Sequence, residues 1–299
     1  LSDPVDLDAD EVAARLRESR FTRELRSFQV RDLGRLLALE HGANFSVPGA
    51  GKTTVTLAAY EAERCAGRIA QLLVVAPLSA FDAWLEETVE CFEHPLRVAK
   101  AGRDPILPDT EVVLVNYQRL DTEYQRLAEW VAQRPTMVVL DEAHRMKRGW
   151  EGAWGSRCLS LAYLAQRRDI LSGTPAPQSP KDFVALFDYL WPGQAIDILP
   201  SDVLVSRPPA DAGERVAEAI RPLFARTTKR EMQLPEVEFD PIVVPLEPLH
   251  AEIYSALRAQ YAGQFLLDDQ DERNLFVMGQ VLMYLLEAAT NPKLLTAGS

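Results

Sequence analysis

Residues 43–53 read Ala-Asn-Phe-Ser-Val-Pro-Gly-Ala-Gly-Lys-Thr, a short strand pattern that runs into a glycine-bearing loop and then a helix. Glycines at positions 49 and 51 allow the backbone to curl so that its N–H groups point inward. The helix that begins near Lys52 adds its positive N-terminal end. Such a loop binds nucleotide phosphates, with the lysine on the β and γ phosphates and the Thr53 hydroxyl on Mg²⁺. We therefore expect ATP and Mg²⁺ to be held by Pro48, Gly49, Ala50, Gly51, Lys52, Thr53 and Thr54.

A second chemical signal follows a run of aliphatic residues. Residues 137–142 read Met-Val-Val-Leu-Asp-Glu, a buried strand that ends in two carboxylates. Ligands bind at the carboxyl ends of strands in open α/β sheets. We expect Asp141 to hold Mg²⁺ and Glu142 to orient and activate the attacking water, so that these two residues and Lys52 are the predicted catalytic residues. An Asp-Glu pair at a strand end is common on protein surfaces, and the phosphate loop upstream is what makes this pair informative.

Short apolar strands and helices alternate from residue 43 onward, which is typical of a parallel sheet with helical crossovers. We therefore predict an α/β fold with helices on both faces of the sheet. The predicted strands are 43–47, 72–76, 97–100, 112–115, 137–140 and 169–171. The predicted helices between them are 52–65, 79–91, 118–133, 156–165 and 180–190.

The two ends of the chain have a different, more helical pattern. We divide the sequence into an N-terminal helical segment at 1–21, an ATP-binding lobe at 22–195, and a linker with a mostly helical extension at 196–299. A further helix is predicted at 22–41 before the first strand. After a connector at 191–213, we predict a helix near 213–225, an extended segment near 238–246, and helices near 248–263 and 273–289.

The formal net charge of −12 argues against attraction of the whole protein to DNA or RNA. Local basic groups are nevertheless present, at 20–35, 97–103, 145–148 and 226–230. The three cysteines and four histidines form no metal-ligand or disulfide spacing. No apolar run is long enough to cross a bilayer and no export signal is visible, so we expect a cytoplasmic protein with no membrane partner. Because the chain begins at Leu1, we expect a piece of a longer protein.

These motifs resemble those of a known family. Asp141-Glu-Ala-His144 resembles the DEAH box of superfamily-two helicases. Leu171-Ser-Gly-Thr-Pro175 resembles their third motif, which links the state of the ATP site to nucleic-acid contact. Both lie in the expected order along the chain, and the order is more specific than either short motif alone.

Finer features resemble the Swi/Snf-like branch of double-strand DNA translocases. Leu25-Arg-Ser-Phe-Gln29 is similar to its leading motif, in which the glutamine reads adenine. Val75-Ala-Pro-Leu-Ser79, followed by Trp84, resembles motif Ia, which touches the DNA backbone, and Val115-Asn-Tyr117 resembles the next motif on the DNA side. The branch also extends the DEAH box through Lys147. Similar features of its later helices and its bridge between lobes occur at 182–192, 226–229, 234–235, 254 and 291–292.

The resemblance covers residues 22–295 and implies the first of two RecA-like lobes that close on ATP and advance along double-stranded DNA. The nucleotide-binding residues that it implies now include Gln29. The implied nucleic-acid or coupling residues are Pro77, Ser79, Tyr117, His144, Arg145, Ser172, Gly173 and Thr174. In this family the second lobe supplies an arginine finger, and its motifs are absent here. We therefore expect this chain alone to bind ATP weakly and to hydrolyse it slowly, if at all.

Residues 46–48 depart from the family, because most remodellers have Asp-Glu-Met where this chain has Ser-Val-Pro. The departure suggests a divergent, bacterial branch. Two alternatives stay open: an RNA or single-strand helicase of the same superfamily, and a nucleotide-gated interaction module of a larger complex, such as a defence system against foreign DNA. Remodelling, protein stripping, restriction and defence all use this motor, and the sequence does not distinguish them.

Overall fold

The computed structural model describes residues 5–174, 181–201, 204–205, 209, 211–232, 245–262, 281–286 and 288–290. The chain forms two compact units, one up to Leu234 and one from Pro235 onward. Pro175, Leu234, Pro235, Asn291 and Pro292, which the sequence assigned to family motifs, lie outside the described residues, as does most of the expected extended segment near 238–246.

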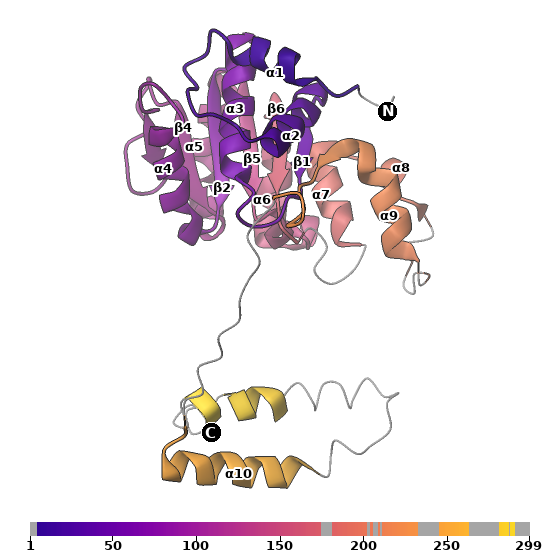
Figure 1. The fold of residues 1–299 in the computed structure, drawn as a ribbon. Helices are drawn as coiled ribbons and strands as arrows, with labels where there is room; N and C mark the ends of the chain where they lie inside the picture. Colours follow the sequence, from indigo (N-terminus) through magenta and orange to yellow (C-terminus); the bar gives the residue numbers. More distant parts are fainter. Residues whose placement is uncertain are drawn as a thin grey trace. The chain divides into compact units, whose positions relative to one another are not determined.

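The described part of the first unit contains a seven-stranded parallel sheet, in the order β3-β4-β2-β5-β6-β1-β7 (Figure 1). This sheet confirms the α/β fold with a parallel sheet. Its strands are β1 Gly42–Asn44, β2 Gln71–Ala76, β3 Val98–Lys100, β4 Val112–Asn116, β5 Thr136–Asp141, β6 Arg167–Leu171 and β7 Phe224–Ala225. In the register of the sheet, Asn44 pairs with Leu171, and Leu171 pairs with Asp141. The carboxyl ends of β1, β6 and β5 therefore lie in one row.

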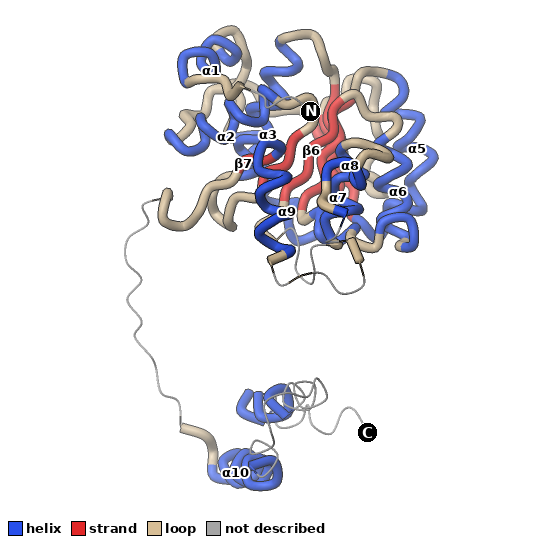
Figure 2. The backbone as a smooth tube through the Cα atoms, turned by 90° about the vertical axis from the view of Figure 1, so that its right-hand side faces the viewer, coloured by secondary structure: helices blue, strands red, loops and turns tan. Residues whose placement is uncertain are grey.

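Helices cover both faces of this sheet (Figure 2). One face packs against α1 Ala9–Leu16, α2 Ser27–Ala38, α3 Lys52–Cys65 and α4 Phe81–Glu90. The other face packs against α5 Leu120–Gln133, α6 Ala153–Ala162, α7 Asp182–Leu190, α8 Ala195–Ile198 and α9 Ala212–Ile220. Short 3-10 turns occur at Leu78–Ala80, Tyr117–Arg119, Ala143–Met146, Gly149–Glu151 and Arg221–Leu223.

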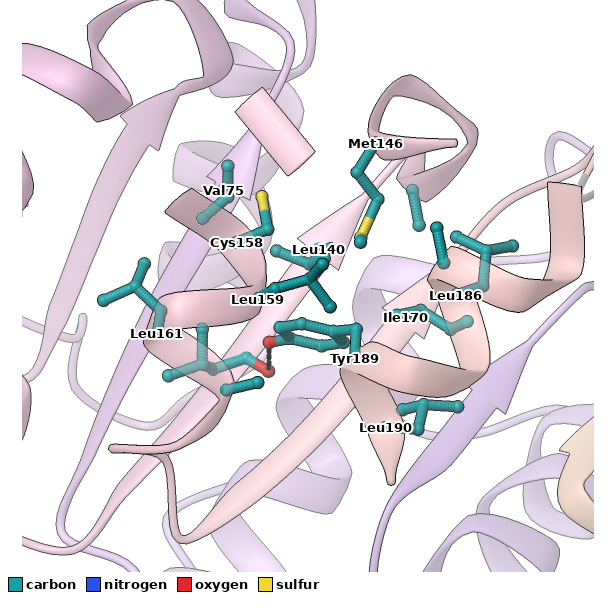
Figure 3. Close-up of a cluster of buried hydrophobic side chains, with 14 of the residues drawn as sticks. Val75, Leu140, Met146, Cys158, Leu159, Leu161, Ile170, Leu186, Tyr189 and Leu190 are labelled. Carbon is teal, nitrogen blue, oxygen red and sulfur yellow. Dashed lines mark hydrogen bonds between the residues drawn. The ribbon is translucent and has the colours of Figure 1, made fainter. Parts of the chain in front are cut away.

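The central strands are buried on both faces, which explains their unbroken aliphatic sequences. Along β2, Leu73 and Val75 face one hydrophobic cluster and Leu72 and Val74 face the other, as the period of two in a strand requires. Figure 3 shows part of the first cluster between the sheet and helices α6 and α7. There the hydroxyl of Tyr189 donates a 2.9 Å hydrogen bond to a carbonyl of β5, which pairs its one buried polar atom.

Two predicted helices have different ends in the structure. The helix predicted at 22–41 is confirmed only from Ser27 to Ala38. The helix predicted near 213–225 ends at Ile220, because Pro222 has no backbone N–H to continue it. The following residues form β7, which pairs with β1 in parallel and lies beyond residue 195, where the sequence ended the ATP-binding lobe. Predicting helix through residue 225 was therefore wrong.

The described part of the second unit is helical, as expected for the C-terminal extension. It contains α10 Pro248–Ala262 and the helical residues 281–286 and 288–290. The imidazole of His250 contacts the backbone carbonyl of Ala288, which joins the two helical stretches. In the described part of the chain, no helix combines the length and apolarity that crossing a membrane requires.

Candidate nucleotide-binding site

The candidate site lies where the aligned strands β1, β6 and β5 end. The predicted phosphate loop follows β1, the third motif follows β6, and the acidic pair closes β5. Because all three strands are parallel and in register, three motifs that are separate in the sequence meet at one edge of the sheet.

The phosphate loop has the backbone shape that the sequence predicted. Gly49 and Gly51 have φ of 83° and 77°, a left-handed region that favours glycine, and Gly51 is the N-cap of α3. The side chain of Gln29 on α2 packs against this turn: its Nε2 donates to the carbonyl oxygen of Ala50 at 3.2 Å, and a Cβ at position 51 would lie 2.2 Å from that Nε2. In this structure Gln29 therefore supports the loop, while its predicted contact with adenine stays a prediction.

Lys52 is the first residue of α3, and its ammonium group returns over the loop. Its Nζ donates to the backbone carbonyls of Ser46 at 2.9 Å and Val47 at 3.4 Å. Burial lowers the pKa of Lys52 below its usual value, while the carboxylates of Glu142 and Asp141 act in the opposite direction. Lys52 and the acidic pair are thus close enough to interact electrostatically, as the predicted nucleotide site requires.

Asp141 is a buried carboxylate with both oxygens hydrogen-bonded. The indole Nε1 of Trp84 donates to Oδ2 and the backbone N–H of Glu142 donates to Oδ1, each at 2.9 Å. Burial raises the pKa of Asp141, and the Trp84 bond opposes that change. The backbone carbonyl of Asp141 accepts a 2.8 Å bond from the hydroxyl of Tyr117, which is fully buried. Tyr117 therefore reaches the acidic pair from inside the fold rather than from the surface.

Glu142 has φ of 50°, and among the described residues it is the one non-glycine residue with a positive φ. Such backbone strain is concentrated at functional sites. Its carboxylate lies 3.2 Å from Nδ1 of His144, and the same nitrogen lies 3.3 Å from the hydroxyl of Ser172. His144 therefore connects the acidic pair with the third motif, the arrangement that a coupling residue needs.

The third motif also contacts the phosphate loop. A Cβ added at Gly173 would lie 3.1 Å from Cδ of Pro48, so a side chain here would push Pro48 aside by a few tenths of an ångström. The backbone N–H of Thr174 donates to the Ser172 hydroxyl at 3.2 Å, which shapes the turn. A displacement of the phosphate loop would therefore also displace residues 172–174, which contact it.

The oxygen groups at the site fit Mg²⁺. Within the described residues the hydroxyl of Thr53 makes no hydrogen bond, whereas that of Thr54 donates to Glu87 on α4 at 2.7 Å. Thr53 is thus free to bind a cation, and Thr54 is engaged in packing. Among the described residues no cluster of three or more metal-ligating side chains occurs. A hydroxyl and one carboxylate, Asp141, suit an Mg²⁺ that also binds phosphate oxygens.

Of the remaining predicted residues, Ser79 and Arg145 lie at the surface and Pro77 is buried. Pro77 follows the last residue of β2, Ser79 lies in the next turn, and beside them lies a cavity of about 350 Å³. That cavity is lined by Leu78, Phe81, Asp82, Lys100, Ala101, Arg103, Asn116 and Arg119. Arg145 is exposed and lines a second cavity of about 300 Å³ together with Lys147, Arg148 and Trp154. The structure does not bring these surface residues into the nucleotide site.

Sequence reasoning missed three residues at the site. Trp84 was assigned to a DNA-contacting motif, yet it is fully buried and bonds to Asp141. Asp32 hydrogen-bonds near the phosphate loop and was not singled out, and Thr227, which also bonds there, was assigned only to the bridge between lobes at 226–229. Asp32 follows Gln29 by one helical turn, a spacing that could have identified it. No sequence signal connects Thr227 to a loop about 180 residues earlier.

The chain matches the SNF2-related domain over residues 45–293. It belongs to that family. Curated relatives of this SNF2-family chain include the mouse DNA excision repair protein ERCC-6-like, 27% identical over 214 residues, and the Arabidopsis thaliana probable ATP-dependent DNA helicase CHR12, 27% identical over 241 residues. These alignments cover 62% and 70% of this chain and 17% and 21% of the relatives. The chain therefore spans only a small part of those proteins.

Solved structures agree on the fold. The SWI2/SNF2 ATPase core of Sulfolobus solfataricus in complex with double-stranded DNA is 22% identical, with a TM-score of 0.59 over 94% of this chain and 61% of that one. A second structure, of the SWI2/SNF2 ATPase core domain of the same organism, is 21% identical, with a TM-score of 0.60 over the whole of this chain and 63% of that one. These structures confirm the RecA-like α/β fold.

Proposed function

We propose that this chain is the ATP-binding lobe of a double-strand DNA translocase, which hydrolyses ATP to ADP and phosphate when joined to a second lobe. The observation that carries the proposal is the meeting of Lys52, Asp141 and Glu142 at the aligned ends of β1 and β5. Membership of the SNF2-related family and the similarity to a probable ATP-dependent DNA helicase support it.

The residues act mainly by electrostatics and positioning. Lys52 exchanges its bonds to the Ser46 and Val47 carbonyls for the β and γ phosphates of ATP. Glu142 orients the attacking water, and Asp141 with Thr53 holds Mg²⁺. When bound, that cation offsets negative charge on the transferring phosphoryl group. His144 carries the change to Ser172 and the third motif.

Two basic surfaces support duplex binding despite the overall charge of −12. One is the cavity beside Ser79 with Lys100, Arg103 and Arg119, and the other is the cavity with Arg145, Lys147 and Arg148. Within the described residues, the side chains of Lys147 and Arg148 have no ion-pair partner. Cations of this kind are available to phosphate groups of DNA.

The test uses the full-length protein that contains this chain. We expect Lys52→Ala to abolish ATP binding or hydrolysis, because the phosphates lose their main cation, and Glu142→Gln to retain ATP but not hydrolyse it. Arg17→Ala, at an exposed position at the end of α1, is the control and should behave as the unaltered protein. Normal DNA-stimulated turnover in Lys52→Ala would contradict the phosphate-loop assignment.

The same assay shows which kind of nucleic acid stimulates ATP hydrolysis. We expect duplex DNA to stimulate hydrolysis more than single-stranded DNA or RNA does; the reverse order would favour a helicase. A complex in which ATP changes partner affinity without any stimulated turnover would favour an interaction module. A bacterial source and a role in defence stay proposals, since the two relatives named above are from mouse and Arabidopsis thaliana.

A further inference from the structure

The chain that follows β7 runs along the phosphate loop. The backbone N–H of Phe45 donates to the carbonyl of Ala225 at 2.8 Å, and that of Val47 donates to the carbonyl of Thr227 at 3.0 Å. The parallel pairing of β1 with β7 thus continues past Asn44 into the loop itself. The first half of the phosphate loop is therefore held in place by residues 225–227.

Three buried side chains join the same two segments to α2. The hydroxyl of Ser46 donates to Oδ2 of Asp32 at 2.9 Å and accepts from the backbone N–H of Thr227 at 2.8 Å. The hydroxyl of Thr227 donates to the same Oδ2 at 2.7 Å. Ser46, Thr227 and Asp32 are 1%, 0% and 3% exposed. Buried and fully paired hydrogen bonds of this kind hold a single geometry and are costly to break.

A guanidinium group encloses this cluster on its outer side. Arg31 donates to Oδ1 of Asp32 and to the Thr227 hydroxyl, both at 2.9 Å, and pairs with Glu231. Glu231 in turn accepts from the backbone N–H of Thr228 at 2.7 Å. Residues 227–231 are therefore bonded to α2 at two positions, Thr227 and Glu231.

The cluster of Asp32, Ser46 and Thr227 is in direct contact with Lys52 through the backbone of Ser46. Lys52 donates to the carbonyls of Ser46 and Val47, and these are the two residues that bond to Thr227. Any change in how Thr227 holds the loop changes the position of both carbonyls. When Lys52 turns to phosphate, the same contacts keep the loop open to receive it.

We propose that Asp32, Ser46 and Thr227 are positioning residues for the phosphate loop, so that the segment leading out of the sheet after β7 forms part of the ATP site. The proposal rests on the proposed nucleotide site. It also gives a reason for serine at position 46, where the strict phosphate-loop pattern has glycine: the hydroxyl joins the loop to α2 and to Thr227, and glycine could not.

The test measures the Kd of ATP with Mg²⁺ by calorimetry on the 299-residue chain. Thr227→Val keeps the shape of the side chain but removes its hydroxyl, and we expect ATP binding to weaken about 5- to 30-fold. Thr227→Ser restores the hydroxyl and should bind within about twofold of the unaltered chain. Ser46→Gly, although it restores the strict pattern, should weaken binding as Thr227→Val does. Thr122→Val, an exposed threonine on α5, is the matched control.

The number of binding sites separates positioning from folding. A variant that only folds poorly shows fewer sites with an unchanged Kd, and that result would overturn the proposal. Unaltered affinity in both Thr227→Val and Ser46→Gly would also overturn it, as would equal weakening in Thr227→Ser and Thr227→Val. If the unaltered chain binds no ATP, then the nucleotide site itself is rejected, which is a different result from loss of the positioning role alone.

Discussion

Two charges of opposite sign, on the half-buried Lys52 and the buried Asp141, lie at the carboxyl edge of the sheet. Burial lowers the pKa of Lys52 and raises the pKa of Asp141. The charge of each group opposes the pKa shift of the other. A buried charge is costly unless it is paired and hydrogen-bonded. Here the Trp84 indole and the Glu142 N–H hold the Asp141 carboxylate in one orientation. The site is therefore already arranged for a cation bound to phosphate.

The Trp84 bond can be tested by removing only its N–H group. In the full-length protein we expect Trp84→Phe to raise the Mg²⁺ concentration for half-maximal ATP hydrolysis about tenfold, because the carboxylate loses a partner that orients it. Trp130→Phe is the matched control, since its buried Nε1 has no hydrogen-bond partner in the described structure. Equal Mg²⁺ requirements in the two variants would show that the indole bond only packs the core.

At the scale of elements, the amino edge of the sheet is a second region of buried charge. His41 precedes β1 and is 2% exposed. Its Nδ1 accepts from the backbone N–H of Arg168 on β6 at 3.4 Å, and its ring packs near Trp191, after α7. Burial, together with the charges of Arg168 and Arg167, lowers the pKa of His41 to about 3. The packing of β1 against β6 and the end of α7 therefore depends on a neutral His41 imidazole.

This lowered pKa predicts how stability changes with pH. Above about pH 6.5 the imidazole is neutral in both folded and unfolded chains, so its contribution is fully present. As pH falls from there toward about 3, the unfolded chain binds the proton first and stability is lost, by about 2 kcal/mol at pH 5. Urea unfolding at pH 7 and pH 5 should show a smaller loss in His41→Gln. His94→Gln, at an exposed position, should leave the loss unchanged. Equal losses in all three chains would exclude His41 as the cause.

At the scale of the whole molecule, one unit contains the sheet and the nucleotide site and the other unit is helical where it is described. Exposed apolar side chains occur along that second unit, including Leu249, Leu282 and Leu286. In the proposed motor, these units would be followed by a second lobe that completes the ATP site from the other side. In that proposal, the site at Lys52 and Glu142 would supply phosphate binding and the water-orienting carboxylate. Among the described residues, no arginine side chain hydrogen-bonds to Lys52 or Glu142.

Rates of ATP hydrolysis test whether a second lobe supplies a catalytic group. We expect the 299-residue chain to bind ATP and to turn it over at least about 10³-fold more slowly than the full-length protein with duplex DNA, because an arginine finger contributes roughly 10³–10⁵ in rate. Single-turnover hydrolysis at saturating ATP measures the difference without interference from weak binding. Comparable rates would show that the second lobe supplies no catalytic group.

Several features of the fold followed from local patterns. Continuous aliphatic runs identified β2, β4 and β5, because strands buried on both faces need no polar alternation. The glycines at 49 and 51 identified the turn before Lys52, because few other residues adopt their φ. β7 was missed, since two residues without a periodic pattern pair with a strand about 180 positions away. Nothing local distinguishes them from the end of a helix.

By itself, then, the amino-acid sequence determined the parallel sheet, the phosphate loop and the carboxylates that end β5. Each is encoded by neighbouring residues whose backbone preferences and burial are local properties. Only the tertiary structure decided that Trp84 bonds to Asp141, that His144 bridges Glu142 and Ser172, and that Thr227 and Asp32 hold Ser46. Those contacts join residues far apart in the chain, and their geometry depends on strand order and register, which no short segment specifies.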